Sequence, residues 1–251
     1  MARIFITGSS DGLGARAAQA LIQRGHKVTL HARNAQRAQD AQKACPGAAS
    51  VLIADLSSTA ETRKLADALN ASGGFDTIIH NAGVMHGVAG TKGPEGIPTL
   101  FAVNTLAAYM LTCLVVPPPR NLVFLSSQLH SGGDTSLRNL RECGYSDSKL
   151  HNTMMAFAFA RKWPDVVVSS LDPGWVQTKM GGRGATDDIG KAVDTYVMLA
   201  EGGEKMQGQS GKHWYQCQPR SFKQAAADEP TQERLLQELE KISGISIPSK
   251  L

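Results

Sequence analysis

ITGSSDGLG, residues 6–14, places three glycines directly behind a short apolar run and at the start of a helical pattern. A tight turn accepts glycine torsions, the missing Cβ atoms let a phosphate approach the backbone, and the helix N-terminus offers unpaired amides. The spacing TGxxxGxG differs from the GxGxxG fingerprint, so a dinucleotide site needs support from elsewhere in the chain. The residues that we expect to contact such a cofactor here are Gly8, Ser9, Ser10, Gly12, Leu13 and Gly14.

Apolar runs and helical patterns alternate along the chain. Runs rich in Val, Ile, Leu and Phe, read as strands, cover 4–7, 27–32, 50–54, 76–80, 121–126 and 166–171. Apolar residues at helical spacing cover 12–24, 34–44, 59–70, 100–116 and 144–162. Residues 212–215 are a candidate seventh strand, and 231–243 a final helix that ends at Gly244. The alternation predicts an α/β fold, a Rossmann-type doubly wound parallel sheet of six to seven strands with helices on both faces.

The composition is that of an ordinary globular protein. Hydrophobic residues make up 42% and charged residues 19% of the 251 residues, and no composition shift divides the chain, so we expect one domain over 1–251. The 26 basic and 22 acidic residues give a net charge of +4, without a basic run. Aromatic residues are only 6% of the chain. These features argue against a nucleic-acid partner.

The cysteines and the apolar segments bear on the cellular location of the protein. Cys45, Cys113, Cys143 and Cys217 are far apart, with no metal-ligand spacing, so we expect reduced thiols and no metal. No signal peptide precedes the first strand, which predicts a cytoplasmic protein. The apolar run 100–116 contains an asparagine and is short for a membrane span, so a buried helix is expected instead.

The end of the second predicted strand, VTLHARN, bears on the choice of cofactor. An NAD site places an acidic residue there for the ribose hydroxyls, but this chain has Ala32, followed by Arg33 and Asn34. A guanidinium binds a 2′-phosphate with paired hydrogen bonds. We therefore expect NADP(H) rather than NAD(H), with Arg33 and Asn34 at the adenosine end.

Polar residues follow two more strands at the edge of the sheet where open α/β folds bind ligands. Asp55 and Leu56 follow the third strand, and Asn81, Ala82 and Gly83 follow the fourth. Each group is also typical of a helix cap or a turn. At this edge they become candidate cofactor residues.

YSDSK places Tyr145 and Lys149 four residues apart, on one face of a predicted helix. An ammonium beside a phenol favours the phenolate, so we expect Lys149 to lower the pKa of Tyr145 and make it a usable acid or base. Ser126 and Ser127 end the fifth strand at the same edge, and a hydroxyl there can polarise a carbonyl. We choose Ser127 because it lies further beyond the strand. No GxSxG elbow surrounds either serine, which argues against a serine hydrolase.

In this order the motifs resemble those of the short-chain dehydrogenase/reductase family over nearly the whole chain, and most closely its retinol dehydrogenase and carbonyl reductase subgroup. The residues that carry the resemblance are TGSSDGLG, Arg33, AD at 54–55, NAG at 81–83, Asn104, SS at 126–127, YSDSK and DPGWVQT at 172–178. The resemblance implies that Tyr145 is the general acid or base. Lys149 would also hold the nicotinamide ribose, Ser127 would bind the substrate oxygen, and Asn104 would anchor a proton-relay water. Pro173, Gly174, Val176 and Thr178 would border the nicotinamide.

The resemblance implies an NADPH-dependent carbonyl reductase, reversible as an alcohol dehydrogenase, with a small-molecule substrate. An NAD-dependent dehydrogenase of the same family and a non-catalytic NADP(H)-sensing protein remain alternatives. The segments 128–144 and 179–225 would bind the substrate, and the glycine-rich 179–188 would be a lid. Residues 128–144 are a longer spacer than simple members have, and a proline run shortens the linker after the Asn104 helix. The family's four-helix dimer is therefore in doubt, and a homodimer, a homotetramer and a monomer stay open.

Overall fold

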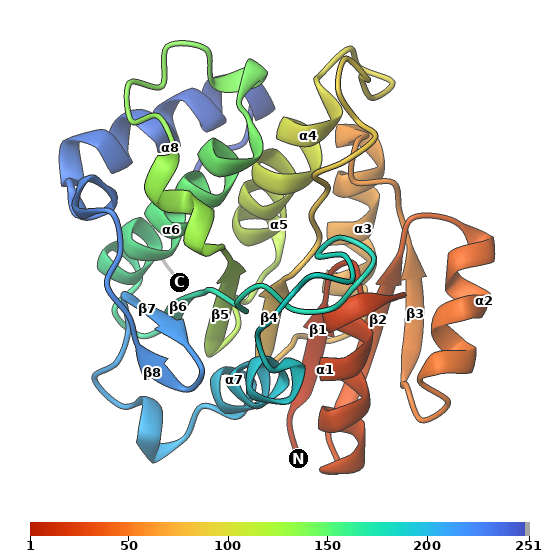
Figure 1. The fold of residues 1–251 in the computed structure, drawn as a ribbon. Coiled ribbons are helices and arrows are strands. Elements are labelled where there is room, and N and C mark those ends of the chain that lie inside the picture. The colour runs from red at the N-terminus through yellow and green to blue at the C-terminus, as the bar shows by residue number, and fades with distance from the viewer. Residues whose placement is uncertain (249–251) are drawn as a thin grey trace.

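The computed structural model describes residues 1–248, which are built around an eight-stranded sheet (Figure 1). The strands lie in the order β3-β2-β1-β4-β5-β6-β7-β8, and all pairs are parallel except β7 with β8. The strands are β1 Arg3–Ile6, β2 Lys27–Ala32, β3 Ser50–Ile53, β4 Thr77–His80, β5 Asn121–Leu125, β6 Val167–Leu171, β7 Lys212–Tyr215 and β8 Gln218–Pro219. The doubly wound α/β prediction is confirmed. The predicted strands correspond to the seven parallel strands β1 to β7. The two-residue strand β8 was not predicted.

Helices cover both faces of the sheet (Figure 1). They are α1 Gly12–Gln23, α2 Ala35–Ala44, α3 Thr59–Ala71, α4 Thr99–Phe101, α5 Ala107–Leu114, α6 Tyr145–Lys162, α7 Ile189–Glu201 and α8 Glu229–Ser243. Residues of α1, α2 and α7 fill one apolar core with the sheet, and residues of α3, α5 and α6 fill the other. Helix α8 packs on α6 and completes the second core. Because consecutive strands are parallel, the loops that follow them meet at one edge of the sheet.

Helix α7 was not among the helices predicted from the sequence. Its N-cap is Asp188, whose carboxylate accepts from the backbone N–H of Gly190 at 2.6 Å. Ala192, Tyr196 and Leu199 are buried at helical spacing against the sheet. The apolar period was present in the sequence, and the cap preceded it, so α7 was predictable.

The helix predicted over 100–116 is divided into three parts. A π-helical turn, η1 (Ala102–Leu106), lies between α4 and α5, and α5 ends at Leu114 before the proline run. The segment is packed against α3 and α6 inside the second core. Within residues 1–248, no helix is both long and apolar enough to cross a membrane.

The strand predicted over 50–54 is not buried on both faces, as the apolar runs had suggested. β3 forms the edge of the sheet, where Ile53 is 51% exposed. An edge strand pairs with one neighbour only, so part of its side-chain surface stays in solvent.

Candidate active site

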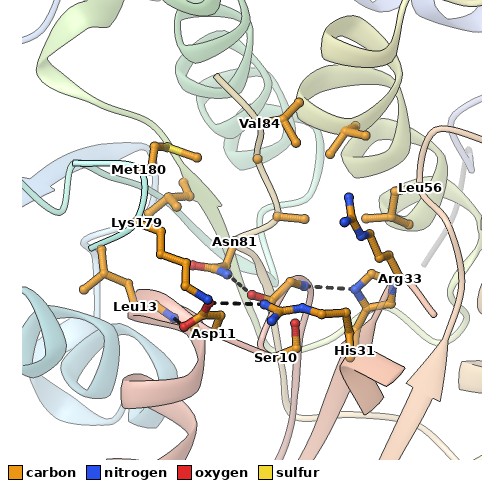
Figure 2. A pocket seen from close by; sticks show the side chains of 18 of the residues that line it. Ser10, Asp11, Leu13, His31, Arg33, Leu56, Asn81, Val84, Lys179 and Met180 are labelled. Atoms are coloured by element: carbon orange, nitrogen blue, oxygen red, sulfur yellow. Dashed lines mark hydrogen bonds and ion pairs between the residues drawn. The ribbon is translucent and has the colours of Figure 1, made fainter. Parts of the chain in front are cut away.

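The β1–α1 loop forms one wall of a groove of about 620 Å³ at the carboxyl edge of the sheet (Figure 2). Its volume is that of a small-molecule or cofactor site. The predicted cofactor residues that line it are Gly8, Ser10, Gly12, Leu13, Gly14, Arg33, Asp55, Leu56, Asn81, Ala82, Gly83 and Thr178. Residues far apart in the sequence therefore meet in one groove, as the strand-end argument predicted.

Two glycines of the loop allow close backbone contact with the loop after β4. Gly8 has a φ of +61°, and a Cβ atom on it would lie 2.9 Å from the Cα atom of Ala82. A Cβ atom on Gly14 would lie 2.5 Å from Asn81 Nδ2. That nitrogen donates to the backbone oxygens of Thr7 at 2.8 Å and Gly8 at 3.0 Å. Asn81 thus holds the glycine loop in shape.

Five predicted cofactor residues outside the Tyr145–Lys149 pair do not line the groove. Ser9 is fully buried, and its hydroxyl donates to Ile6 O at 2.8 Å, so the expected contact of its side chain with a cofactor is not found. Asn34 caps α2, since its Oδ1 accepts from the backbone N–H of Arg37 at 2.9 Å. Both side chains form hydrogen bonds with backbone groups three residues away, rather than facing the groove. The other three residues are Pro173, Gly174 and Val176.

His31 on β2 supports the glycine loop from below, a role that the sequence analysis missed. Its Nδ1 accepts from the backbone N–H of Gly8 at 2.9 Å, so Nε2 carries the proton and donates to Ala54 O at 3.0 Å. Burial lowers the pKa of His31 to about 4, and the ring is therefore neutral at pH 7. It connects β1, β2 and β3 at the edge that carries the groove.

Asp11, Arg37 and Lys179 form a charged cluster in the lining of the groove. Figure 2 shows Asp11 and Lys179 on one side of the groove and Arg33 on the other. Asp11 caps α1 through Gly12 N at 2.8 Å, and its other oxygen lies 2.5 Å from Lys179 Nζ and 3.2 Å from the Arg37 guanidinium. Lys179 lowers the pKa of Asp11 most strongly. The two cations neutralise an acid at the helix N-terminus, where an anionic ligand binds best. Arg37 and Lys179 were not predicted, although Arg37 follows Arg33 by four residues.

Tyr145 and Lys149 lie at the start of α6, as predicted. Lys149 is 1% exposed, its Nζ donates to Leu125 O at 3.0 Å, and it lies 5.3 Å from the Tyr145 ring centre. Burial lowers the pKa of Lys149 to about 8. Burial and, as a smaller cause, the negative charge of Asp172 raise the pKa of Tyr145 to about 12. The expected lowering of the Tyr145 pKa is wrong here, because lost hydration outweighs the nearby ammonium. The phenol is protonated at neutral pH.

The π-helical turn η1 brings Asn104 to the same place. Its Oδ1 accepts from the backbone N–H of Val84 at 2.7 Å, and its Nδ2 donates to Val84 O at 2.9 Å and to Ser148 Oγ at 3.0 Å. A Cβ atom on Gly83 would lie 3.4 Å from Lys149 Nζ and 3.6 Å from Asn104 Oδ1. The side chains of Lys149 and Asn104 therefore both lie beside Gly83, which lines the groove.

The two serines after β5 have different surroundings. The Ser126 hydroxyl is buried and donates to Lys149 O at 2.9 Å, whereas Ser127 Oγ accepts from the backbone N–H of Leu129 at 3.2 Å. The accepted bond leaves the Ser127 proton available. Within residues 1–248, the Tyr145 hydroxyl donates only to Met180 Sδ, a weak acceptor, at 3.8 Å. Among the described residues, no hydrogen bond joins the Ser127 and Tyr145 hydroxyls, so each can serve a third group.

The family model described as short chain dehydrogenase matches residues 2–188. The chain belongs to this family. An uncharacterized oxidoreductase of Emericella nidulans is 46% identical to this short-chain dehydrogenase over 253 residues, with 99% of each chain covered. Retinol dehydrogenase 14 of Mus musculus is 27% identical over 96% of this chain and 86% of its own length. The resemblance to the family is confirmed, and the short-chain dehydrogenase has retinol dehydrogenase-like relatives.

A solved structure with the same fold was crystallised with a cofactor. The protein, described as a short chain dehydrogenase from Escherichia coli complexed with NADPH, has a TM-score of 0.65 and 26% identity to this short-chain dehydrogenase. The similarity covers 84% of this chain and 95% of the other. By its family, this short-chain dehydrogenase is an oxidoreductase.

Proposed function

We propose that this oxidoreductase is an NADPH-dependent carbonyl reductase that also oxidises the corresponding alcohols. The observation that carries the proposal is that Lys149 and Asn104 lie beside Gly83, a residue that lines the same groove as the glycine loop, and that Lys149 lies next to the Tyr145 ring. A groove of this kind holds an extended cofactor with its reactive end beside a proton donor.

The groove residues fit a nicotinamide dinucleotide. The approach of Gly8 to Ala82 and of Gly14 to Asn81 keeps the loop free of Cβ atoms beside the α1 N-terminus, where a diphosphate binds. Arg33 would hold the 2′-phosphate, and Lys149 the hydroxyls of the nicotinamide ribose. A bound nicotinamide supplies the hydride. The NADPH complex of the Escherichia coli relative supports the cofactor.

The protein's own groups would handle the carbonyl oxygen. Ser127 would donate its free proton to that oxygen and orient the substrate, and Tyr145 would transfer its proton as negative charge develops there. A phenol whose pKa is raised to about 12 is in the protonated form that reduction requires. The buried Lys149 ammonium, near the Tyr145 ring at 5.3 Å, would stabilise the phenolate that remains.

Turnover of a broad panel tests the proposal. Purified protein should consume NADPH, followed by its absorbance, with members of a set of aliphatic and aromatic aldehydes and ketones. Consumption should depend on both the carbonyl compound and the protein. Tight NADPH binding with no turnover on any carbonyl compound, and no oxidation of the matching alcohols, would argue for the sensing protein instead.

Arg33→Ala should weaken NADPH binding by about 10- to 100-fold and leave NADH binding unchanged, because one charge-assisted contact to a phosphate is worth about 1.5–3 kcal/mol. The measurement is a fluorescence titration with each cofactor. Arg24→Ala is the matched control. The Arg24 guanidinium lies 2.6 Å from a Glu201 carboxylate oxygen, and neither residue lines the groove. An unchanged preference for NADPH in Arg33→Ala would contradict the cofactor assignment.

We also propose that residues 1–251 form one domain with the substrate site inside it, made from 128–144 and 179–225. Met180 supports this arrangement because its sulfur contacts the Tyr145 hydroxyl. Lys179 connects the same segment to Asp11 on the cofactor loop. A segment that touches both sites suits the role of a lid over the substrate.

A further inference from the structure

A buried histidine lies directly behind Ser127. His130 belongs to the 3₁₀ turn η2 (Gln128–Gly132), which Ser127 caps, and only 3% of it is exposed. Its Nδ1 lies 2.7 Å from the backbone oxygen of Ser127, which also accepts from the His130 backbone N–H at 3.0 Å. The proposed mechanism assigns this ring no role.

The contacts of His130 determine which nitrogen carries its proton. The backbone N–H of Lys223 lies 3.1 Å from Nε2 and can only donate, so Nε2 accepts. Nδ1 must then carry the hydrogen and donate to Ser127 O. Burial is the main cause that lowers the pKa of His130 below its usual value, and the ring is neutral at pH 7.

Lys223 also forms a second hydrogen bond to the turn that Ser127 caps, through its side chain. Lys223 Nζ donates to Gly133 O at 2.7 Å, at the end of the turn. Gly133 is packed on α6, since a Cβ atom on it would lie 2.8 Å from Leu150 Cβ and 2.9 Å from Ser146 O. The turn is therefore fixed on both sides, against the helix that begins with Tyr145 and against the chain before α8.

We propose that neutral His130 is a positioning residue, which sets the Ser127 hydroxyl toward the substrate carbonyl by joining Ser127 O to the Lys223 backbone N–H. The inference rests on the proposed carbonyl reductase function and extends it. Through this one ring, the segment that precedes α8 controls the geometry of the oxygen-binding serine. Ser127 Oγ and Ser127 O accept from neighbouring backbone N–H groups of one short turn, those of Leu129 and His130, so a shift of that turn moves the hydroxyl together with the carbonyl oxygen.

Protonation of His130 would break this connection. A proton on Nε2 would face the Lys223 N–H, so two donors would oppose each other at 3.1 Å. The charged and titratable groups that face the ring are Asp172, which favours its protonation, Arg220 and Lys223, which oppose it, and His213, whose ring centre lies 4.7 Å away. Reduction should be retained above the pKa of His130 and lost as the pH falls through it.

Substitutions at His130 distinguish a positioning role from a general loss of folding. Asparagine presents an N–H close to the Nδ1 position but no acceptor at the Nε2 position, so His130→Asn should reduce carbonyl compounds faster than His130→Ala and more slowly than wild type. The amide does not titrate, so the acid limb of the pH profile should be lost. His130→Ala should lower kcat about tenfold, the effect of one hydrogen bond, with NADPH affinity unchanged. Thermal unfolding of both variants shows whether they fold.

A double-mutant cycle with Ser127→Ala shows whether His130 acts through that serine. The two losses in kcat should not add, so that Ser127→Ala/His130→Ala is as slow as Ser127→Ala alone. Additive losses, an unchanged kcat in His130→Ala, or an acid limb that persists in His130→Asn would each overturn the proposal. A wild-type protein that reduces no carbonyl compound would remove the proposed function itself, and this inference with it.

Lys223→Pro tests the other end of the connection. Proline fits the φ of −60° at this residue but has no N–H, whereas Lys223→Ala removes only the ammonium and is the matched control. Without the opposing donor, the pKa of His130 should rise, so Lys223→Pro should shift the acid limb to higher pH than Lys223→Ala. Identical pH profiles of the two variants would also overturn the proposal.

Discussion

Replacing Tyr145 with phenylalanine should lower kcat of carbonyl reduction by about two to four orders of magnitude, the usual contribution of a positioned proton donor. The Tyr145 hydroxyl donates to Met180 Sδ, and the pKa of the phenol, raised to about 12, keeps its proton in place at pH 7. The ring itself stays, so NADPH affinity should be unchanged. Steady-state rates and a cofactor titration on the same preparation measure both quantities.

Tyr109→Phe is the control for Tyr145→Phe. The Tyr109 hydroxyl is buried in the core and donates to Ile245 O at 2.8 Å. Its loss should lower the free energy of unfolding by about 1 kcal/mol and leave turnover intact. Wild-type turnover in Tyr145→Phe would exclude the phenol as the acid, and the proposed chemistry would then need another donor.

Gly8→Ala should destabilise the protein by about 2–5 kcal/mol, combining about 1–2 kcal/mol for a left-handed backbone with about 1–3 kcal/mol for a crowded contact. The φ of +61° strains an alanine, and its Cβ atom would press on the Ala82 backbone at 2.9 Å. We expect the melting temperature to fall by about 4–20 °C. NADPH affinity should fall at least about tenfold, because Gly8 and Ala82 both line the groove and their separation would change its shape.

Gly25→Ala isolates the backbone strain. Gly25 has a φ of +84°, but no atom lies within 4 Å of the position that its Cβ would take. This variant should lose only about 1–2 kcal/mol and bind NADPH normally. Equal NADPH affinities in Gly8→Ala and Gly25→Ala would show that the contact with Ala82 does not shape the groove.

The sheet and most of the groove followed from the sequence because both depend on local patterns. Apolar runs and helical periods fixed the parallel strands, and the position of a residue after a strand was enough to bring Asp55 and Gly83 to one edge. Helix α7 carried the same kind of signal, in the spacing of Tyr196 from Ala192, and could have been found.

Side-chain partners were less predictable, because they depend on contacts between distant segments. The sequence did not show that Ser9 turns its hydroxyl back to Ile6, or that burial would raise rather than lower the pKa of Tyr145. Two of the contacts join residues more than 90 positions apart. They are the ion pair of Lys179 with Asp11 and the hydrogen bond of Lys223 with His130. No local pattern encodes such contacts.

Helix α8 has a consequence for the way this protein is made. Its residues Leu235 and Leu239 are fully buried in the core that also contains Met154 and Phe159 of α6. A nascent chain that still holds α8 inside the ribosome therefore exposes the α8-facing side of α6 to solvent or to chaperones. The helix that starts with the proposed proton donor gains its final packing only after synthesis has passed the last turn of α8.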